Sequence, residues 1–535
     1  IDRHLVLRNI TFVDCLNHMN LWLENVSNLR VINCTFQDTN NHGIVINGVN
    51  GGPYCDNITI EESYFDDLDY GIIGHYGDNW LFSNCSFGSN IDDQHIDLDY
   101  VTNLTIEFMN SDTPKYDSTA KFRFENIEDF LIRNITINSS GSDGILINNG
   151  QNGVFVNSSF SQFTSRTPIN FGGTNLNVNI TNNAFTTIDA NPVIELVSTT
   201  FFNVSENTFT DCSYGNGILM AYAYNCTFRN NDLSQTGFFL SQDSYNLTIS
   251  DNNLVNDLPV KYFEKDAEIV MKDIGAIGQL YLNCVNDSIF HGAQFGGGYN
   301  PFEIRNIVNV TITNFDFENT YYGIYARSCE NWTVNSSSFT NVYDGLDIQT
   351  SENFNFTENT FTNGWDGVSL SSAINTQMID NDFDVENMAL YAWVNINGFY
   401  ARRNHFLDGK FSLQHNPSMD LDTSNTLLGH PILYLTGQSN LHYQNTQFSY
   451  VDLLLCKDIS FENVQFTGNY KGFIFQDSNS TTINNCEFTG YSSEAIGLVN
   501  VTNFWINGSR FEDLGYGIGI NYGYDGMVSN NHFTN

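Results

Sequence analysis

Apolar residues recur along this chain in short alternating phrases, with no helical stripe of useful length. One phrase reads Asn-x-x-Phe, as at Asn33–Phe36 and Asn84–Phe87, and a Gly-Ile-x-Ile phrase such as Gly43–Ile46 follows it. A third phrase reads Asn-x-Thr-Ile, as at Asn57–Ile60. Each alternates apolar and polar positions, the period of a strand with one buried face. Asn, Gly, Asp and Ser separate the phrases and tolerate the left-handed backbone of tight turns, so one repeat is predicted to be three short strands.

The phrases return with a fixed period. Steps of 22, 22, 22, 22 and 23 residues separate Phe295, Phe317, Phe339, Phe361, Phe383 and Phe406, and steps of 22, 23 and 22 separate Phe466, Phe488, Phe511 and Phe533. A period in this range indicates stacked structural repeats, because a single repeat cannot bury its own apolar face. We predict an all-β solenoid of roughly 20 parallel rungs of about 22 residues, with three short strands in each rung.

The spacing, the Asn residues at turns and the Gly-Ile-x-Ile phrases together resemble the right-handed parallel β-helix family. In particular they are similar to its repeats of carbohydrate-binding and sugar-hydrolase type, which are common among archaeal and bacterial surface proteins. The resemblance covers nearly the whole chain and implies a right-handed parallel β-helix. It leaves the function open, because this fold serves lyases, hydrolases, epimerases, adhesins and inert stalks.

The repeat pattern breaks twice, at Leu258–Tyr262 and near Gly429–Tyr434. The breaks match each other, since 25 residues separate Pro259 from Cys284 and also Pro431 from Cys456. They resemble Pro-x-x-Tyr excursions between blocks of rungs in archaeal β-helix surface proteins. The predicted segments are a β-helix block over 1–257, an excursion over 258–279, a block over 280–427, an excursion over 428–450 and a block over 451–535. Whether the excursions protrude from one rod or separate sub-rods stays open.

The balance of 20 basic and 60 acidic residues gives a formal net charge of −40. Such a surface repels nucleic acid and anionic membranes, so we expect neither as a partner. No run of 18 apolar residues occurs, so no transmembrane helix and no membrane insertion of this segment are expected. The chain opens and stops on rungs, and we expect any signal peptide or anchor to lie outside it.

Cysteine positions follow the repeat. Cys34, Cys85, Cys226 and Cys486 each lie two residues before a rung Phe and share its strand parity, which predicts thiols that point into the core. Cys34 and Cys85 are two rungs apart, about 10 Å, which is too far for a disulfide.

Asn-x-Ser/Thr sequons are dense and predict an N-glycosylated chain at the cell surface or outside the cell. The alternative is that Asn-bearing turns followed by Thr-bearing strands produce sequons by chance. The predicted glycosylation sites are Asn9, Asn25, Asn33, Asn57, Asn84, Asn103, Asn134, Asn157, Asn179, Asn203, Asn225, Asn246, Asn309, Asn331, Asn355, Asn479, Asn500 and Asn507.

Charge is most concentrated on one predicted strand face. Aligning successive Gly-Ile-x-Ile strands places His75, Asp99 and Glu125 in one outward column, with Asp97 and Arg123 in the column beside it. His95 and Lys121 fall at the entrances of these strands. We expect a cross-rung ion pair between Asp97 and Arg123. We also expect repulsion between Asp99 and Glu125, relieved by protonation or by a cation.

Two kinds of chemistry fit these five residues. Carboxylates beside a base resemble the sites of polysaccharide lyases and epimerases, so His75, Asp97, Asp99, Arg123 and Glu125 are the candidate catalytic residues. Asp97, Asp99 and Glu125 are also candidate calcium ligands, and calcium is the one cofactor considered. The alternative is a solvated polar face. The Asn-Thr-Asp, Gly-His-Gly and Arg-Ile-Lys set of polygalacturonases is missing, and Asp344-Gly345 echoes it only faintly.

Aromatic residues form a second candidate site. Tyr321, Tyr322, Tyr325, Tyr343 and Trp365 fall within three rungs, with Arg327 and Asp347 nearby. Aromatic side chains stack on sugar rings, which would suit glycan recognition, and the alternative is packing at rung corners, since Tyr and Trp favour strands.

The uniform rungs, the sequons and the missing catalytic signature favour a non-enzymatic extracellular rod as the leading hypothesis. Its role would lie in a surface layer, sheath, filament or adhesin, with self-association or other surface proteins as partners. The alternative is a polysaccharide lyase or epimerase acting on acidic glycans, or a non-catalytic glycan-binding module.

Overall fold

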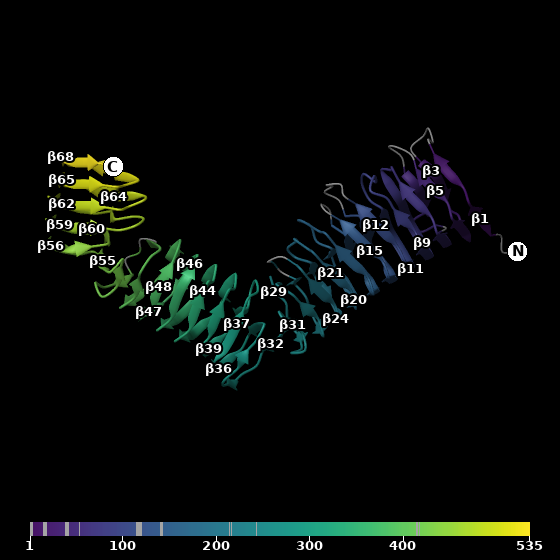
Figure 1. Ribbon diagram of the computed structural model, residues 1–535, viewed down its shortest axis with the longest axis horizontal. Helices are drawn as coiled ribbons and strands as arrows, with labels where there is room; N and C mark the ends of the chain where they lie inside the picture. Colours follow the sequence, from purple (N-terminus) through teal and green to yellow (C-terminus); the bar gives the residue numbers. More distant parts are fainter. Residues whose placement is uncertain are drawn as a thin grey trace. The chain divides into compact units, whose positions relative to one another are not determined.

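The computed structural model describes residues 4–13, 19–37, 42–52, 54–113, 120–139, 143–212, 215, 217–241, 243–413, 416 and 418–534. Within these ranges the chain consists of strands and turns without a helix, and so without any helix able to span a membrane. The strands form a parallel solenoid of about 23 turns of roughly 22 residues, which confirms the predicted fold (Figure 1).

Each turn contributes one strand to each of three stacks. A typical turn comprises β3 (Met19–Glu24), β4 (Leu29–Ile32) and β5 (Thr35–Gln37). They pair in parallel with β6 (His42–Asn47), β7 (Cys55–Glu61) and β8 (Tyr64–Asp66) of the next turn. We call the stack with the Gly-Ile-x-Ile phrases the first sheet, that with the Asn-x-Thr-Ile phrases the second sheet, and that with the Phe residues the third sheet.

The third sheet holds the predicted phenylalanine ladder. Phe295, Phe317, Phe339, Phe361, Phe383 and Phe406 are in register, and neighbouring ring centroids lie 4.5 to 4.9 Å apart. The rings are buried and nearly parallel. Stacked aromatic pairs of this kind are worth about 0.5–1.5 kcal/mol each beyond the area they bury. The ladder therefore fills the core of these six turns and helps to fix their register.

Asparagine closes the turn between the second and third sheets. Asn33 and Asn84 have φ values of 51° and 52°, the left-handed conformation that Asn tolerates better than most residues. Inside the solenoid, Asn359, Asn381, Asn404 and Asn425 form a buried ladder in which each side-chain amide donates to the next amide oxygen at 2.8–3.0 Å. These amides also donate to backbone carbonyls, so the buried turns are satisfied.

The chain comprises two compact units. Unit 1 contains Ile1–Glu264 and Gly298–Asn300, and unit 2 contains Lys265–Gly297 and Pro301–Asn535. In unit 1, β31 (Leu254–Val255) and β32 (Leu258–Glu264) form an antiparallel hairpin. In unit 2, β54 (Thr426–Leu427) and β55 (His430–Thr436) do the same.

The two hairpins share one turn chemistry and mark the starts of the two predicted excursions. Both central residues have positive φ, at Asn256 and Asp257 and again at Leu428 and Gly429. That is the geometry of the two-residue hairpin turns whose twist matches the strands. In unit 2, β55 also pairs in parallel with β58 (Tyr450–Leu454), so the excursion over 428–450 carries part of a turn. The division of the chain into five segments stays a prediction.

The cysteine prediction is confirmed at the four rung positions. Cys34, Cys85, Cys226 and Cys486 are buried free thiols. Burial raises the pKa of the Cys85 thiol to about 12, so it stays protonated at neutral pH. These thiols act as small core residues.

Candidate functional site

The charged face predicted in unit 1 has the expected register. It is built by β9 (Tyr70–Ser83), β11 (Ile96–Glu107) and β13 (Phe122–Glu125), which stack in parallel. His75 pairs with Asp99, and Asp99 pairs with Glu125. Asp97 pairs with Arg123 in the adjacent column. The five residues of the predicted site therefore lie together on the first sheet.

Ion pairs and amides neutralise this face. The Arg123 guanidinium lies 3.3 Å from Asp97 Oδ1 and 2.5 Å from Glu125 Oε1. Asp99 Oδ1 instead accepts a hydrogen bond from Asn126 Nδ2 at 3.0 Å. Asp99 and Glu125, expected to repel each other, thus have separate partners. Burial raises the pKa of Asp97 against the opposing effect of Arg123. The Arg123 guanidinium, paired with two carboxylates, suits charge neutralisation better than proton abstraction.

The structure gives no support to calcium at this face. The described residues include no group of three or more His, Cys, Asp or Glu side chains arranged to hold a metal ion. Calcium coordination by Asp97, Asp99 and Glu125 therefore stays a prediction and enters no step below.

His95 and Lys121 belong to the interior of unit 1. Both side chains are fully buried at the starts of their strands. Lys121 Nζ donates to the Asp93 carbonyl at 3.2 Å, and His95 Nδ1 lies 3.0 Å from Ser111 Oγ. Burial and the nearby Lys121 hold the pKa of His95 well below its usual value, so its imidazole is neutral. Neither residue faces a ligand at the surface.

The predicted aromatic cluster in unit 2 is contiguous. It lies where the chain enters β41 (Tyr322–Arg327), β44 (Asp344–Thr357) and β46 (Asp366–Ile374). Ring centroids are 4.6 Å apart between Tyr321 and Tyr343 and 6.0 Å apart between Tyr343 and Trp365, with nearly parallel planes in the second pair.

The members of this cluster differ in exposure. Tyr343 and Trp365 are 43% and 41% exposed, whereas Tyr321, Tyr322 and Tyr325 are half-buried. The first two therefore form the accessible part of the cluster, and the other three support it.

Three carboxylates stand beside this aromatic stack. Asp344 and Asp366 are register partners on adjacent turns, and Asp347 follows Asp344 on β44. They line a pocket of about 180 Å³. Its lining residues are Asp344, Gly345, Leu346, Asp347, Asp366, Gly367, Val368, Ser369, Met388 and Tyr391. We call this the acid pocket.

The three carboxyl groups of the acid pocket differ in their surroundings. Burial, and then the charges of Asp366 and Asp347, raise the pKa of Asp344 to about 6. Burial also raises the pKa of Asp347, although Gln349 Nε2 donates to it at 3.1 Å. Asp366 Oδ1 accepts hydrogen bonds from Asn387 Nδ2 and from the Met388 amide, both at 2.8 Å. The pocket thus holds a carboxyl group that exchanges a proton near neutral pH beside a carboxylate fixed by two donors.

A second aromatic pair borders the acid pocket on the following turn. Tyr391 and Trp393 on β49 (Met388–Val394) are 39% and 48% exposed, and their rings are parallel with centroids 6.0 Å apart. Tyr391 itself lines the pocket. The backbone register shifts by one residue between β46 and β49 after Leu370. Exposed aromatic rings therefore lie before and after the carboxylates along the first sheet.

The sequence pattern contains a signal for this site. The dipeptide Asp344-Gly345, which only faintly echoes the polygalacturonase motif, recurs 22 residues later as Asp366-Gly367. Two acids at one rung position must stack. A column of acids beside an aromatic column was therefore readable from the repeat, whereas the contribution of Tyr391 was not.

Solved structures with a similar fold come from polysaccharide-active proteins. The A-module of the mannuronan C-5 epimerase of Azotobacter vinelandii shares 11% identity at a TM-score of 0.26, covering 72% of this chain and 91% of that chain. An alginate lyase from Paenibacillus shares 10% at 0.25, covering 44% and 97%. An exopolygalacturonase from Thermotoga maritima shares 10% at 0.29, covering 65% and 83%. At such identities the likeness concerns the fold. A search of curated protein sequences found no match.

These comparisons correct the leading functional hypothesis. The non-enzymatic rod of a surface layer, sheath, filament or adhesin is not what they favour, because the matched structures are named for an epimerase, a lyase and a hydrolase of polysaccharides. The alternative, a polysaccharide-active protein, is for this chain a proposal that has to rest on the geometry of unit 2. The archaeal resemblance has no counterpart among the comparisons.

The sequence itself matches the profile described as the right-handed β-helix region. The match covers residues 116–257, 280–450 and 451–535, well over half of the chain. The parallel register of its turns and the stacked phenylalanines agree with this match. The chain is a member of the right-handed β-helix family.

Proposed function

We propose that this chain is an enzyme that hydrolyses glycosidic bonds in a polysaccharide, with the acid pocket of unit 2 as its active site. The observation that supports this is the raised pKa of Asp344, about 6, in a pocket shared with two further carboxylates. Paired carboxyl groups with separated proton affinities are the usual equipment of glycoside hydrolysis.

The roles follow from the environments. Asp344, protonated below its raised pKa, donates its proton to the glycosidic oxygen as the bond between that oxygen and the anomeric carbon breaks. Asp366, fixed by the Asn387 and Met388 donors, accepts a proton from the water that attacks the anomeric carbon. Asp347 adds negative charge that stabilises the oxocarbenium-like transition state. The net reaction breaks one glycosidic bond, consumes one water molecule and forms two free sugar ends.

Substrate binding is assigned to the aromatic residues on either side. Tyr343 and Trp365 precede the carboxylates along the first sheet, and Tyr391 and Trp393 follow them. Sugar rings present C–H faces that stack on aromatic rings. The pocket lining contains three carboxylates and no cation, in a chain of net charge −40. This charge disfavours a polyuronate, so we propose a neutral polysaccharide as the substrate.

The test is a screen of neutral and acidic polysaccharides that follows new reducing ends. We expect release from at least one neutral polysaccharide, an activity that decreases as the pH rises above about 6, and a loss of about 10²–10⁴-fold in Asp344→Asn. Asp316→Asn, an exposed acid on the third sheet of the same unit, serves as the matched control. Full activity in Asp344→Asn would refute the assignment.

A second candidate is lyase or epimerase chemistry at the charged face of unit 1. One observation favours it: His75 lies in register with Asp99, and Asp97 and Arg123 pair in the adjacent column. His75 would then remove the C5 proton of a uronate whose carboxylate is neutralised by Arg123. Formation of an unsaturated product from a polyuronate, and its loss in an Asp99→Ala, Arg123→Ala double variant, would establish this reaction. If only unit 2 is active, no unsaturated product forms.

Glycosylation and an extracellular location stay predictions. In several sequons the amide nitrogen that would carry the glycan instead donates to the turn below. Asn33 Nδ2 donates to Asn9 Oδ1 at 2.8 Å, and Asn309 Nδ2 donates to Asp287 Oδ1 at 2.8 Å. This favours the explanation of these sequons by turn formation. Mass spectrometry of the secreted chain before and after enzymatic deglycosylation tests the prediction.

A further inference from the structure

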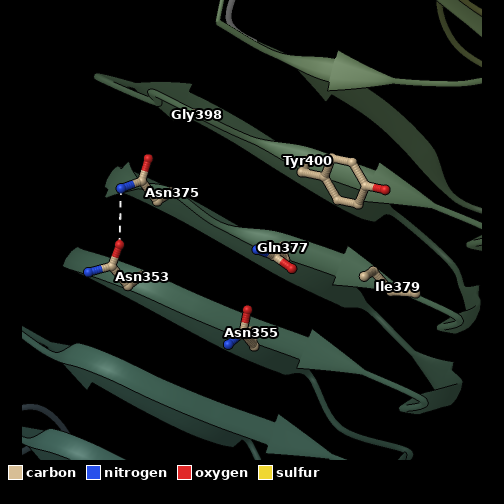
Figure 2. Close-up of a pocket in the computed structure, with 7 residues that line it drawn as sticks. All are labelled: Asn353, Asn355, Asn375, Gln377, Ile379, Gly398 and Tyr400. Carbon is tan, nitrogen blue, oxygen red and sulfur yellow. Dashed lines mark hydrogen bonds between the residues drawn. The ribbon is translucent and has the colours of Figure 1, made fainter.

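A second pocket of unit 2 lies on the second sheet. It has a volume of about 510 Å³. Its lining comes from β44, β47 (Gln377–Ile379) and β50 (Tyr400–Arg402) and from the turns that precede β47 and β50 (Figure 2). Its lining residues are Asn353, Asn355, Asn375, Gln377, Ile379, Gly398 and Tyr400. We call this the amide pocket. Its volume falls within the usual range of about 300–1,000 Å³ for ligand pockets.

The pocket opens where a ladder of turn asparagines stops. Asn353 Nδ2 donates to Asn331 Oδ1 at 2.8 Å, and Asn375 Nδ2 donates to Asn353 Oδ1 at 3.0 Å. At the next turn the corresponding residue is Gly398, with a φ of 68° like that of the left-handed asparagines. A Cβ there would lie 2.5 Å from Asn375 Oδ1. Asn375 Oδ1 thus occupies the place that a side chain at position 398 would take, so the ladder stops at this glycine, which lines the pocket.

Two side-chain amides in this pocket are available to a ligand. Asn355 and Gln377 are register partners whose side chains point out of the sheet beside Tyr400 (Figure 2). Within the described part of the chain, neither side-chain amide has a hydrogen-bond partner. Each amide offers two donors and one acceptor. The amide groups of turn residues Asn353 and Asn375, by contrast, are used in the ladder.

Tyr400 supplies a ring in register with Gln377 on the following turn. The Arg402 guanidinium carbon lies 4.1 Å from the centroid of this ring. Arg402 in turn pairs with Asp420 at 2.7 Å and Asp422 at 3.0 Å, so its charge is balanced. The ring is therefore held in position, and the lining of the pocket carries no net charge.

We infer that the amide pocket binds a neutral oligosaccharide. Sugar hydroxyls both donate and accept hydrogen bonds, as the amides of Asn355 and Gln377 do, and the Tyr400 ring offers a stacking surface. The lining offers no carboxylate to hold a cation, and the net charge of −40 disfavours an anion. A neutral polyol is the ligand class that meets both conditions.

The position of the amide pocket connects it to the acid pocket, and this part of the inference rests on the proposed function. Strand β44 carries Asp344 and Asp347 at its start and Asn353 and Asn355 near its end. It bends at Thr350, where φ is 55°. The two pockets thus occupy the same turns on adjacent sheets of one unit. The amide pocket acts as a holding site that keeps a neutral polysaccharide next to the acid pocket.

The test is calorimetric titration of the full chain with cellohexaose, maltohexaose, laminarihexaose and mannohexaose. A background of Asp344→Asn with Trp365→Ala prevents hydrolysis and weakens stacking beside the acid pocket. We expect binding to persist in this background. It should weaken by about tenfold in Gln377→Ala, which removes one hydrogen-bonding group. Gly398→Asn, which extends the ladder into the pocket, should weaken it further.

Thr333→Ala is the matched control, because Thr333 holds the position of Asn355 one turn earlier and lies outside the pocket. It should bind as the background does, and circular dichroism melting verifies that each variant folds. Three results would overturn the inference. The first is no binding of any neutral hexaose, and the second is that Gln377→Ala and Gly398→Asn both bind as tightly as the background. The third is that an oligogalacturonate binds more tightly than the neutral hexaoses. A wild-type chain that binds here but hydrolyses nothing would refute the proposed function and leave this site standing.

Discussion

The charged face of unit 1 and the acid pocket of unit 2 lie on equivalent strands of the repeat and differ in the partners of their carboxylates. In unit 1, Arg123 bridges Asp97 and Glu125. In unit 2, no salt bridge reaches Asp344, Asp347 or Asp366 from any described residue. The strand geometry that brings acids together is common to both, so the difference lies in the partners.

The presence or absence of a cationic partner distinguishes carboxylates that stabilise the fold from carboxylates that are available for chemistry. A carboxylate beside a guanidinium has its charge compensated and contributes to register and stability. In the acid pocket, burial and then the charges of two neighbouring carboxylates raise the pKa of Asp344 to about 6, which costs stability and creates an acid that works near neutral pH. The aromatic residues follow the same division. Exposed stacked rings border the pocket in unit 2, whereas the Tyr76–Tyr100 stack of unit 1 lies near carboxylates that are already paired.

The largest expected effect concerns the carboxylates themselves. Asp366→Asn removes the proposed base and should lower kcat on the polysaccharide identified by the screen by about 10²–10⁴-fold. Asp97→Asn at the paired face of unit 1 should change kcat by less than about twofold, because that carboxylate is outside the proposed site. Reducing-end assays on both variants measure this. Comparable losses in the two variants would erase the distinction between the faces.

The next effect concerns the aromatic residues. Trp365→Ala should raise KM by about tenfold with a smaller change in kcat, because stacking is present in the ground state as well as in the transition state. Tyr100→Ala in the stacked pair of unit 1 is the control and should leave KM unchanged. Steady-state kinetics separate the two parameters. A KM increase in Tyr100→Ala instead would move substrate binding to unit 1.

The smallest effect is on stability and depends on pH. Because the pKa of Asp344 is raised from 3.8 to about 6, its neutral form favours folding. That contribution is fully present below about pH 3.8 and is lost as the pH rises through about 6. Asp344→Asn should therefore stabilise the protein at pH 7 by about 1 kcal/mol, after discounting for solvent screening, and leave it unchanged near pH 4.

Arg123→Ala provides the opposite sign for this comparison. It leaves Asp97 and Glu125 without their cation and should destabilise the protein by about 1 kcal/mol at pH 7. Denaturant titrations at both pH values measure the two differences. Stabilisation by Arg123→Ala, or destabilisation at pH 7 by Asp344→Asn, would contradict the view that pairing distinguishes the two faces.

The sequence predicted the fold and the register because both are set by local chemistry repeated at a constant interval. Ile72 and Ile96 could be aligned with Ile44 of the Gly-Ile-x-Ile phrase from their place in the repeat, and the structure pairs the three in that order. The column of His75, Asp99 and Glu125 followed from the same alignment.

Partner choice and irregular register could not be predicted in this way. Nothing in the spacing shows that Glu125 lies against Arg123 while Asp99 lies against Asn126. The register shift after Leu370, in the turn that brings Tyr391 to the acid pocket, breaks the period on which the alignment depended. The contribution of Tyr391 to the candidate active site therefore could not be predicted from the period, whereas the stacking of Asp344 on Asp366 follows from it.

The phenylalanine ladder gives the chain a natural unit of growth. Because each ring rests on the ring of the adjacent turn, a whole turn can be duplicated or deleted without exchanging the inner and outer faces of any strand. A change of one residue within a strand reverses the faces beyond it. Duplication of whole turns would lengthen the surface of the solenoid one turn at a time. A local irregularity can change the shape of one turn while the neighbouring turns keep their structure.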